Sequence, residues 1–189
     1  LTYIGETFSP ELIEIVNVTN RISNNFFAET MLKTVGKTLS GRGSYYSSTK
    51  ALKEYLADRG ISVFGFTQDD GSGLSRENYV STRFFCGYYT MMSKSATFAR
   101  FFESLPGPGR PGTLSNVLKN DDPALKATIR AKSGSLSGVR CYAGYVDSQK
   151  GLFKFAILVN NYSCPTRMVQ PKIEGFLREL AKYGAEIEQ

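Results

Sequence analysis

Apolar residues recur at helical spacing through the first part of the chain and at strand spacing through the last part. Ser9-Pro10-Glu11 predicts the start of a first helix, because serine, proline and an acidic residue each favour a helix N-terminus. Two further helical stretches are predicted to end at Gly36 and at Gly60, and residues 61–66 form a short β-prone run. Two aromatic-rich segments follow at helical spacing, which favours core packing over ligand binding. They contain Phe84, Phe85, Tyr88, Tyr89, Phe98, Phe101 and Phe102.

The pattern changes near residue 120. Three strands are predicted over 127–132, 139–146 and 152–159, and their short connections imply antiparallel neighbours. A last helix is expected from about Gln170 or Pro171 to Tyr183. The sequence therefore predicts an α+β fold, with a helical part over about 1–120 and an antiparallel sheet backed by a terminal helix over about 121–189.

Composition narrows the possible functions. The chain has 189 residues and a net charge of +6, but its basic residues are scattered, which favours general surface solvation over a nucleic-acid footprint. It has no histidine, which excludes Ser-His-Asp and Cys-His catalysis and His-based zinc sites within it. The three cysteines, Cys86, Cys141 and Cys164, are interpreted as small buried hydrophobes. We expect no cofactor, no metal site and no transmembrane segment.

Two tripeptides carry candidate chemistry: Ser23-Asn24-Asn25, between the first two predicted helices, and Lys132-Ser133-Gly134, at the end of the first predicted strand. In acyl transfer from a peptide that ends in a free carboxylate, a cation and a hydroxyl are needed to hold that carboxylate, and Lys132 and Ser133 supply both. Gly134 lets a substrate backbone approach the strand. Ser23 can relay a proton, and the amide of Asn25 can hold the substrate's amide carbonyl.

Four segments together resemble the class C low-molecular-mass penicillin-binding proteins, the D-alanyl-D-alanine carboxypeptidases that also act as endopeptidases. The segments, in the order in which that family has them, are 23–29, 70–76, 112–114 and 130–136. The resemblance implies part of a penicillin-binding or serine β-lactamase-like transpeptidase fold. It also implies a serine carboxypeptidase that cleaves peptidoglycan stem peptides ending in D-Ala-D-Ala through an acyl-enzyme. Inhibition by β-lactams and a periplasmic or cell-envelope location are implied as well.

The same resemblance assigns roles. Ser23 would be the proton-relay serine and Asn25 the substrate-positioning amide, while Lys132 and Ser133 would bind the terminal carboxylate. The backbone N–H of Ser135 would form one half of the oxyanion hole.

The nucleophile of this family lies in a Ser-x-x-Lys motif that precedes Ser-x-Asn. Ser47-Ser48-Thr49-Lys50 has that spelling but follows Ser23, so it is interpreted as a decoy in which Ser47 or Ser48 is a helix N-cap. We therefore expect a segment upstream of Leu1 to supply the nucleophile, and the chain to be a fragment or processed piece that is inactive alone.

Two other functions remain open at this stage: a non-catalytic module that binds peptidoglycan peptides or a protein partner, and a serine β-lactamase relative. Two local alternatives also remain. Ser23 is a possible N-cap of the second helix, and Asp70-Gly71-Ser72-Gly73 is interpreted as a backbone turn in preference to a catalytic loop.

Overall fold

The computed structural model describes residues 4–185. It contains seven helices and one three-stranded antiparallel sheet in the order β1-β2-β3, within those residues. The helices are α1 (Leu12–Ile22), α2 (Asn25–Ser40), α3 (Tyr45–Asp58), α4 (Thr82–Met92), α5 (Phe98–Ser104), α6 (Pro123–Ala127) and α7 (Thr166–Ala185). The strands are β1 (Ile129–Leu136), β2 (Val139–Ser148) and β3 (Gly151–Asn160). The predicted α+β architecture, with helices first and a sheet and terminal helix last, is confirmed.

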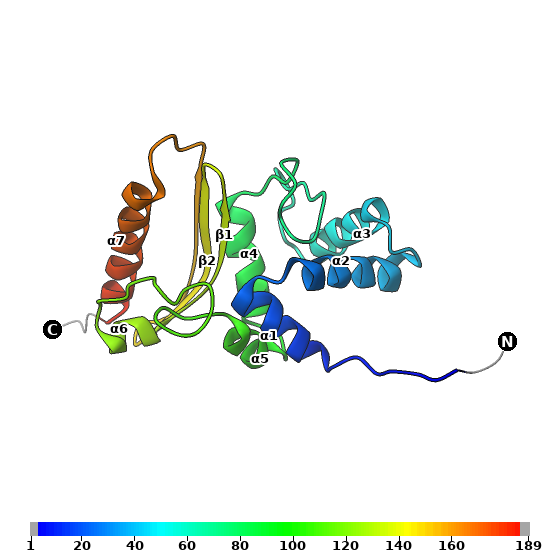
Figure 1. The fold of residues 1–189 in the computed structure, drawn as a ribbon, viewed down its shortest axis with the longest axis horizontal. Helices are drawn as coiled ribbons and strands as arrows, with labels where there is room; N and C mark the ends of the chain where they lie inside the picture. Colours follow the sequence, from blue (N-terminus) through cyan, green and yellow to red (C-terminus); the bar gives the residue numbers. More distant parts are fainter. Residues whose placement is uncertain (1–3, 186–189) are drawn as a thin grey trace.

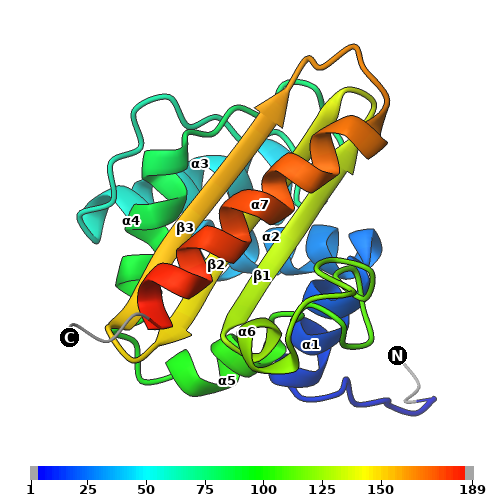
Figure 2. The same ribbon diagram turned by 90° about the vertical axis from the view of Figure 1, so that its left-hand side faces the viewer.

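The sheet separates two layers of helices. Helix α7 runs along one face of the sheet, and α4 lies against the other (Figures 1 and 2). On the α7 side, Val146, Ile173 and Leu177 belong to one apolar core. On the α4 side, Tyr89 and Tyr145 belong to a second core, where the Tyr89 hydroxyl donates to the Ala143 carbonyl at 3.1 Å and the Tyr145 hydroxyl donates to the Tyr89 carbonyl at 2.9 Å. Both phenol groups therefore have a hydrogen-bond partner inside the protein. Burial raises the pKa of each.

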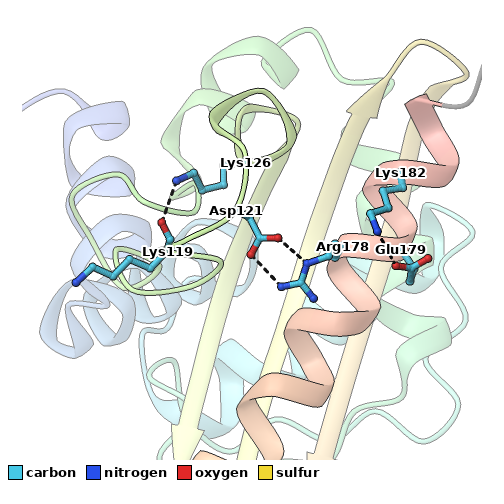
Figure 3. A network of polar contacts seen from close by, with 6 residues as sticks. All are labelled: Lys119, Asp121, Lys126, Arg178, Glu179 and Lys182. Atoms are coloured by element: carbon cyan, nitrogen blue, oxygen red, sulfur yellow. Dashed lines mark hydrogen bonds and ion pairs between the residues drawn. The ribbon is translucent and has the colours of Figure 1, made fainter.

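A polar network ties α7 to the loop that precedes α6 (Figure 3). The Arg178 guanidinium forms a two-pronged contact with the Asp121 carboxylate, of which the Nη2–Oδ2 distance is 2.9 Å. This bond, together with the charge of Arg178, holds the pKa of Asp121 below its usual range. The contact links α7 to the segment that leads into α6 and β1.

Three predicted helix boundaries were wrong. The first helix is capped by Glu11 and not by Ser9, and α2 continues past Gly36 to Ser40, where Gly41 ends it at φ +75°. Gly36 is instead a packing position, since a Cβ there would overlap Ser48 of α3. Helix α7 begins at Thr166, before the predicted start.

Candidate active site

A cleft of about 770 Å³ lies between the α1–α2 junction, the loop around residues 68–74 and the outer edge of β1. Both tripeptides line it, although more than a hundred residues separate them along the chain. The structure thus brings together every residue that the sequence analysis selected. These residues are Ser23, Asn25, Lys132, Ser133, Gly134 and Ser135.

Ser23 is held at the cleft by an unusual backbone conformation. It ends α1 at φ +59° and ψ +53°, in the left-handed region that residues other than glycine seldom adopt. Asn24, not Ser23, caps α2: its side chain accepts a hydrogen bond from the Phe27 N–H at 3.0 Å. The interpretation of Ser23 as an N-cap is therefore wrong, and its hydroxyl has no local role in starting α2. Instead, the Ser23 Oγ accepts a hydrogen bond from Lys132 Nζ at 2.9 Å.

Lys132 extends from β1 into the cleft. Its Nζ donates to Ser23 Oγ and also to the Ser133 carbonyl, at 2.7 Å. Burial lowers the pKa of Lys132 to about 8, because the ammonium is partly removed from water and has no buried carboxylate beside it among residues 4–185. At neutral pH the side chain is still mainly a cation, and it is positioned to attract an anionic group into the cleft.

The outer edge of β1 is available to a ligand along its second half. The Ala131 N–H points away from β2 and donates to the Pro106 carbonyl at 3.0 Å. Because N–H direction alternates along a strand, the N–H groups of Ser133 and Ser135 point to the same outer side. No described segment of the sheet pairs with them, since β1 is an edge strand within residues 4–185. The position of the Ser135 N–H therefore suits an oxyanion-hole donor.

Gly134 keeps this part of the cleft open. A Cβ at this position would contact only the Cβ of Cys141 within the protein, at an ordinary 3.7 Å. Internal packing therefore does not require glycine here. The exposed position on the cleft wall leaves the room that a bound peptide backbone needs.

Asp70-Gly71-Ser72-Gly73 forms a backbone turn, as predicted, and two carboxylates hold it in place. Asp70 accepts hydrogen bonds from the N–H groups of Gly73, Leu74 and Ser75 at 2.7, 3.0 and 2.7 Å. Glu29 of α2 accepts hydrogen bonds from the two preceding backbone N–H groups, those of Gly71 and Ser72, both at 3.0 Å.

Burial would raise the pKa of both carboxyls, but hydrogen bonds outweigh it and hold each pKa below its usual range. The largest of these effects come from the Ser72 side chain on Glu29 and from the Asn78 amide on Asp70, and the backbone N–H groups add to them. The turn nevertheless forms one wall of the cleft.

Ser47 lies outside the cleft. Its hydroxyl donates to the Arg42 carbonyl at 2.9 Å, and Lys50 is exposed on the surface of α3. The N-cap of α3 is Ser44, so the prediction that Ser47 or Ser48 caps this helix was wrong. Ser48 is fully buried against Gly36.

The sequence analysis missed several lining residues. Thr113 belongs to a segment that it quoted without a role; its N–H bonds the Arg21 carbonyl at 2.9 Å, which ties this loop to the end of α1. The sequence around Arg140 of β2 does not indicate that this residue lines the cleft, because only the pairing of β2 with β1 brings it opposite Ser135. Within residues 4–185, no cluster of three cysteine or acidic side chains is arranged to hold a metal ion, and no helix is long and apolar enough to span a membrane.

Solved structures share this fold. Penicillin-binding protein 4 from Haemophilus influenzae, in complex with a β-lactam, superposes with a TM-score of 0.77 at 26% identity, over 92% of this chain and 41% of that one. The TLA-3 extended-spectrum β-lactamase shares the fold, with a TM-score of 0.69 at 13% identity over 92% of this chain and 64% of that one. The fold is therefore that of the penicillin-binding proteins and serine β-lactamases.

Sequence comparison identifies the family. Residues 3–180 match the D-Ala-D-Ala carboxypeptidase 3 (S13) family, and the chain belongs to it. A D-alanyl-D-alanine carboxypeptidase from Actinomadura sp. (strain R39) is 32% identical over 96% of this chain and 35% of its own length. DacB, a D-alanyl-D-alanine carboxypeptidase from Haemophilus influenzae, is 28% identical over 85% and 34%. The chain spans about a third of the length of these relatives. The resemblance to low-molecular-mass penicillin-binding proteins is confirmed.

Proposed function

We propose that this chain forms the substrate cleft of a serine-type D-alanyl-D-alanine carboxypeptidase that acts on peptidoglycan stem peptides and is inhibited by β-lactams. The observation that carries the proposal is the 2.9 Å contact between Lys132 Nζ and Ser23 Oγ, in a cleft bordered by the free edge of β1. Membership of the S13 family supports it. By resemblance to its relatives, the protein acts in the periplasm or cell envelope.

The substrate would bind as an added strand along the outer edge of β1. The terminal carboxylate would meet the Lys132 ammonium and the Ser133 hydroxyl, and the Asn25 amide would hold the substrate's amide group from the opposite wall. The carbonyl of the penultimate D-alanine would accept a hydrogen bond from the Ser135 N–H. Each contact uses a group that already lines the cleft.

Acyl transfer would then need a proton for the leaving amine. Because the Ser23 Oγ accepts its hydrogen bond from Lys132, its own O–H proton is free to point into the cleft. As the nucleophile's oxygen bonds the carbonyl carbon, its hydroxyl proton would pass to the lysine of the Ser-x-x-Lys segment. As the C–N bond breaks, Ser23 would give its own proton to the nitrogen of the departing D-alanine and take up the proton held by that lysine. Water would next hydrolyse the acyl-enzyme. The nucleophile would come from a Ser-x-x-Lys segment of a longer protein, so this chain alone would be inactive.

Release of D-alanine from acetyl-D-Ala-D-Ala peptides by the longer protein tests the proposal. We expect Ser23→Ala and Lys132→Ala each to lower kcat/KM by about 10²- to 10⁴-fold, because each removes a proton-transfer or charge-binding group. The matched control is Ser47→Ala, which removes a hydroxyl outside the cleft and should leave kcat/KM unchanged.

Binding of the peptide without cleavage would instead support a non-catalytic binding module, and faster hydrolysis of β-lactams than of peptides would support a β-lactamase relative. Full activity of Lys132→Ala would contradict the assigned role of Lys132.

A further inference from the structure

Arg130 of β1 is a buried cation whose hydrogen-bonding groups lack partners. Its side chain is 7% exposed, and its Nε and Nη1 have no hydrogen-bond partner among residues 4–185. The remaining nitrogen, Nη2, lies 4.0 Å from the Glu103 carboxylate, whose side chain is 67% exposed, so this ion pair is long and weakened by water. Because burying a charged donor without an acceptor costs free energy, this guanidinium is suited to a ligand that accepts hydrogen bonds.

Two further arginines lie near Arg130. Arg21 lies in the last turn of α1 and Arg110 in the loop after α5, and these two helices pack together at the end of the sheet where β1 begins (Figure 2). Burial and the positive charges of Arg110 and Arg21 lower the pKa of Arg130, while the charge of Glu103 opposes them. Three guanidinium groups therefore share one carboxylate, and positive charge is in excess at this place.

The loop after α5 brings Arg110 next to Arg130 at a glycine. A Cβ on Gly107 would overlap Nη1 of Arg130 and would lie 3.5 Å from Cδ of Arg110, so both side chains pass beside this residue. The loop is fixed to β1, since the Ala131 N–H donates to the Pro106 carbonyl at 3.0 Å. The Arg110 side chain is exposed and makes no hydrogen bond or ion pair within the described part of the chain. It can therefore move aside and uncover Nη1 of Arg130 without breaking either kind of contact.

The third arginine is held beside the same carboxylate. Nη2 of Arg21 donates to the Glu103 backbone carbonyl at 3.2 Å, which keeps its guanidinium close to the residue that faces Arg130. The other close neighbour of Arg130 is the Phe102 ring, whose centre lies 5.9 Å from Cζ and which offers no acceptor oxygen. None of the three arginines lines the cleft, so this place is separate from the candidate active site.

The donors and the charge match a tetrahedral oxyanion. Guanidinium groups bind carboxylates and phosphates through pairs of N–H groups, and a phosphate accepts hydrogen bonds on more sides than a planar carboxylate does. Two negative charges on the ligand would offset the excess positive charge. We propose that Arg21, Arg110 and Arg130 form a binding site for a phosphate dianion, which is either free phosphate or the terminal phosphate of a phosphomonoester. The site does not depend on the proposed function.

Isothermal titration calorimetry of the longer protein tests the site, near neutral pH and at constant ionic strength, with inorganic phosphate and glycerol 3-phosphate as probes. We expect saturable binding of one phosphate per chain. Arg110→Gln should raise the Kd about tenfold, because a charge-assisted contact is lost, and Arg130→Gln should abolish binding. The matched control is Arg59→Gln, which changes an exposed arginine that stacks on Tyr55 at 3.4 Å from the ring centre and should leave the Kd unchanged.

A second control separates this site from the cleft. Lys132→Ala removes the cation of the cleft and should also leave the Kd unchanged, so loss of phosphate binding in this variant would overturn the inference. Failure of the unmodified protein to bind either probe would overturn it too, as would an unchanged Kd in Arg110→Gln. Binding of inorganic phosphate alone would support the site with free phosphate as its ligand, and binding of both probes would support it with a phosphomonoester.

If thermal unfolding shows that Arg130→Gln does not fold, two exposed positions decide. Arg110→Gln should weaken phosphate binding, whereas Glu103→Gln removes the opposing carboxylate and should strengthen binding about threefold. Changes in the same direction for both variants would contradict a site in which Arg130 holds the anion.

Discussion

Among the described hydrogen bonds, the one from Lys132 to Ser23 is the only one that joins the sheet directly to the α1–α2 junction. The Lys132 ammonium serves two proposed purposes, which are to hold the substrate's carboxylate and to orient the Ser23 hydroxyl. Both depend on the protonated form. Because burial lowers the pKa of Lys132 from 10.5 to about 8, both functions should be lost within the pH range that proteins tolerate.

The resulting pH dependence has a defined sign. Below pH 8 the ammonium is present and an anionic ligand is attracted; as the pH rises through about 8 the charge is lost, so β-lactam acylation by the longer protein should slow above that pH. Between pH 8 and 10.5 the unfolded chain binds this proton more strongly, so the free energy of unfolding should rise with pH through this group.

Titration of isotope-labelled lysine side chains by NMR measures this pKa directly in the present chain. We expect one inflection near pH 8 that disappears in Lys132→Met. An inflection for Lys132 at or above pH 10, close to the ordinary value of 10.5, would contradict the burial of its ammonium.

At this scale the sequence predicted the chemical groups better than their local roles. Ser23 and Asn24 are both good helix caps, and only the left-handed backbone at Ser23 determines that Asn24 caps α2. Arg140 was not predicted at all. Its place beside Ser135 follows from the pairing of β1 with β2, and its orientation follows from Gln170, thirty residues away.

Among the elements, the turn around Asp70 shows how a wall of the cleft is built without regular structure. The backbone N–H groups of this turn have no partner in a helix or a sheet, and the carboxylates of Asp70 and Glu29 accept their hydrogen bonds instead. Its turn character was predictable from Asp, Gly and Ser in succession, whereas the contact with Glu29, more than forty residues away, was not.

Asp70→Ala should lower the free energy of unfolding by about 1–3 kcal/mol, because the half-buried Ser75 N–H and Asn78 amide lose their acceptor, as do two exposed backbone N–H groups. Since hydrogen bonds hold the pKa of Asp70 below 3.8, the stabilisation from its charge is present above that pH and is lost as the pH falls through the lower, folded-state value. Urea unfolding at pH 7 and pH 3 measures both effects.

The matched control is Asp69→Ala, which changes an exposed neighbour and should cost less than about 0.5 kcal/mol. Equal losses for the two variants would contradict the role given to Asp70.

Helix boundaries were the least predictable feature of the elements. Glycine ends many helices, but Gly36 lies inside α2 because Ser48 of α3 needs the space, and no local pattern distinguishes the two uses. In contrast, the three strands were placed within a few residues, because their short connections and β-prone composition are local signals.

Over the whole molecule, the order of helices, meander and terminal helix followed from the change in periodicity near residue 120. The meeting of the two tripeptides in one cleft did not follow from periodicity, since it depends on how the helical layer lies against β1. The resemblance to a family supplied that expectation, and the structure and the S13 match agree with it.

The central claim is that this cleft recognises substrate and β-lactam while its nucleophile comes from a segment of a longer protein. Intact-mass measurement after incubation with a labelled penicillin tests it most directly, followed by mapping of the labelled peptide. We predict no adduct on the present chain, and one adduct on the longer protein at a serine outside these 189 residues. A stable adduct on Ser47 of the present chain would contradict the account.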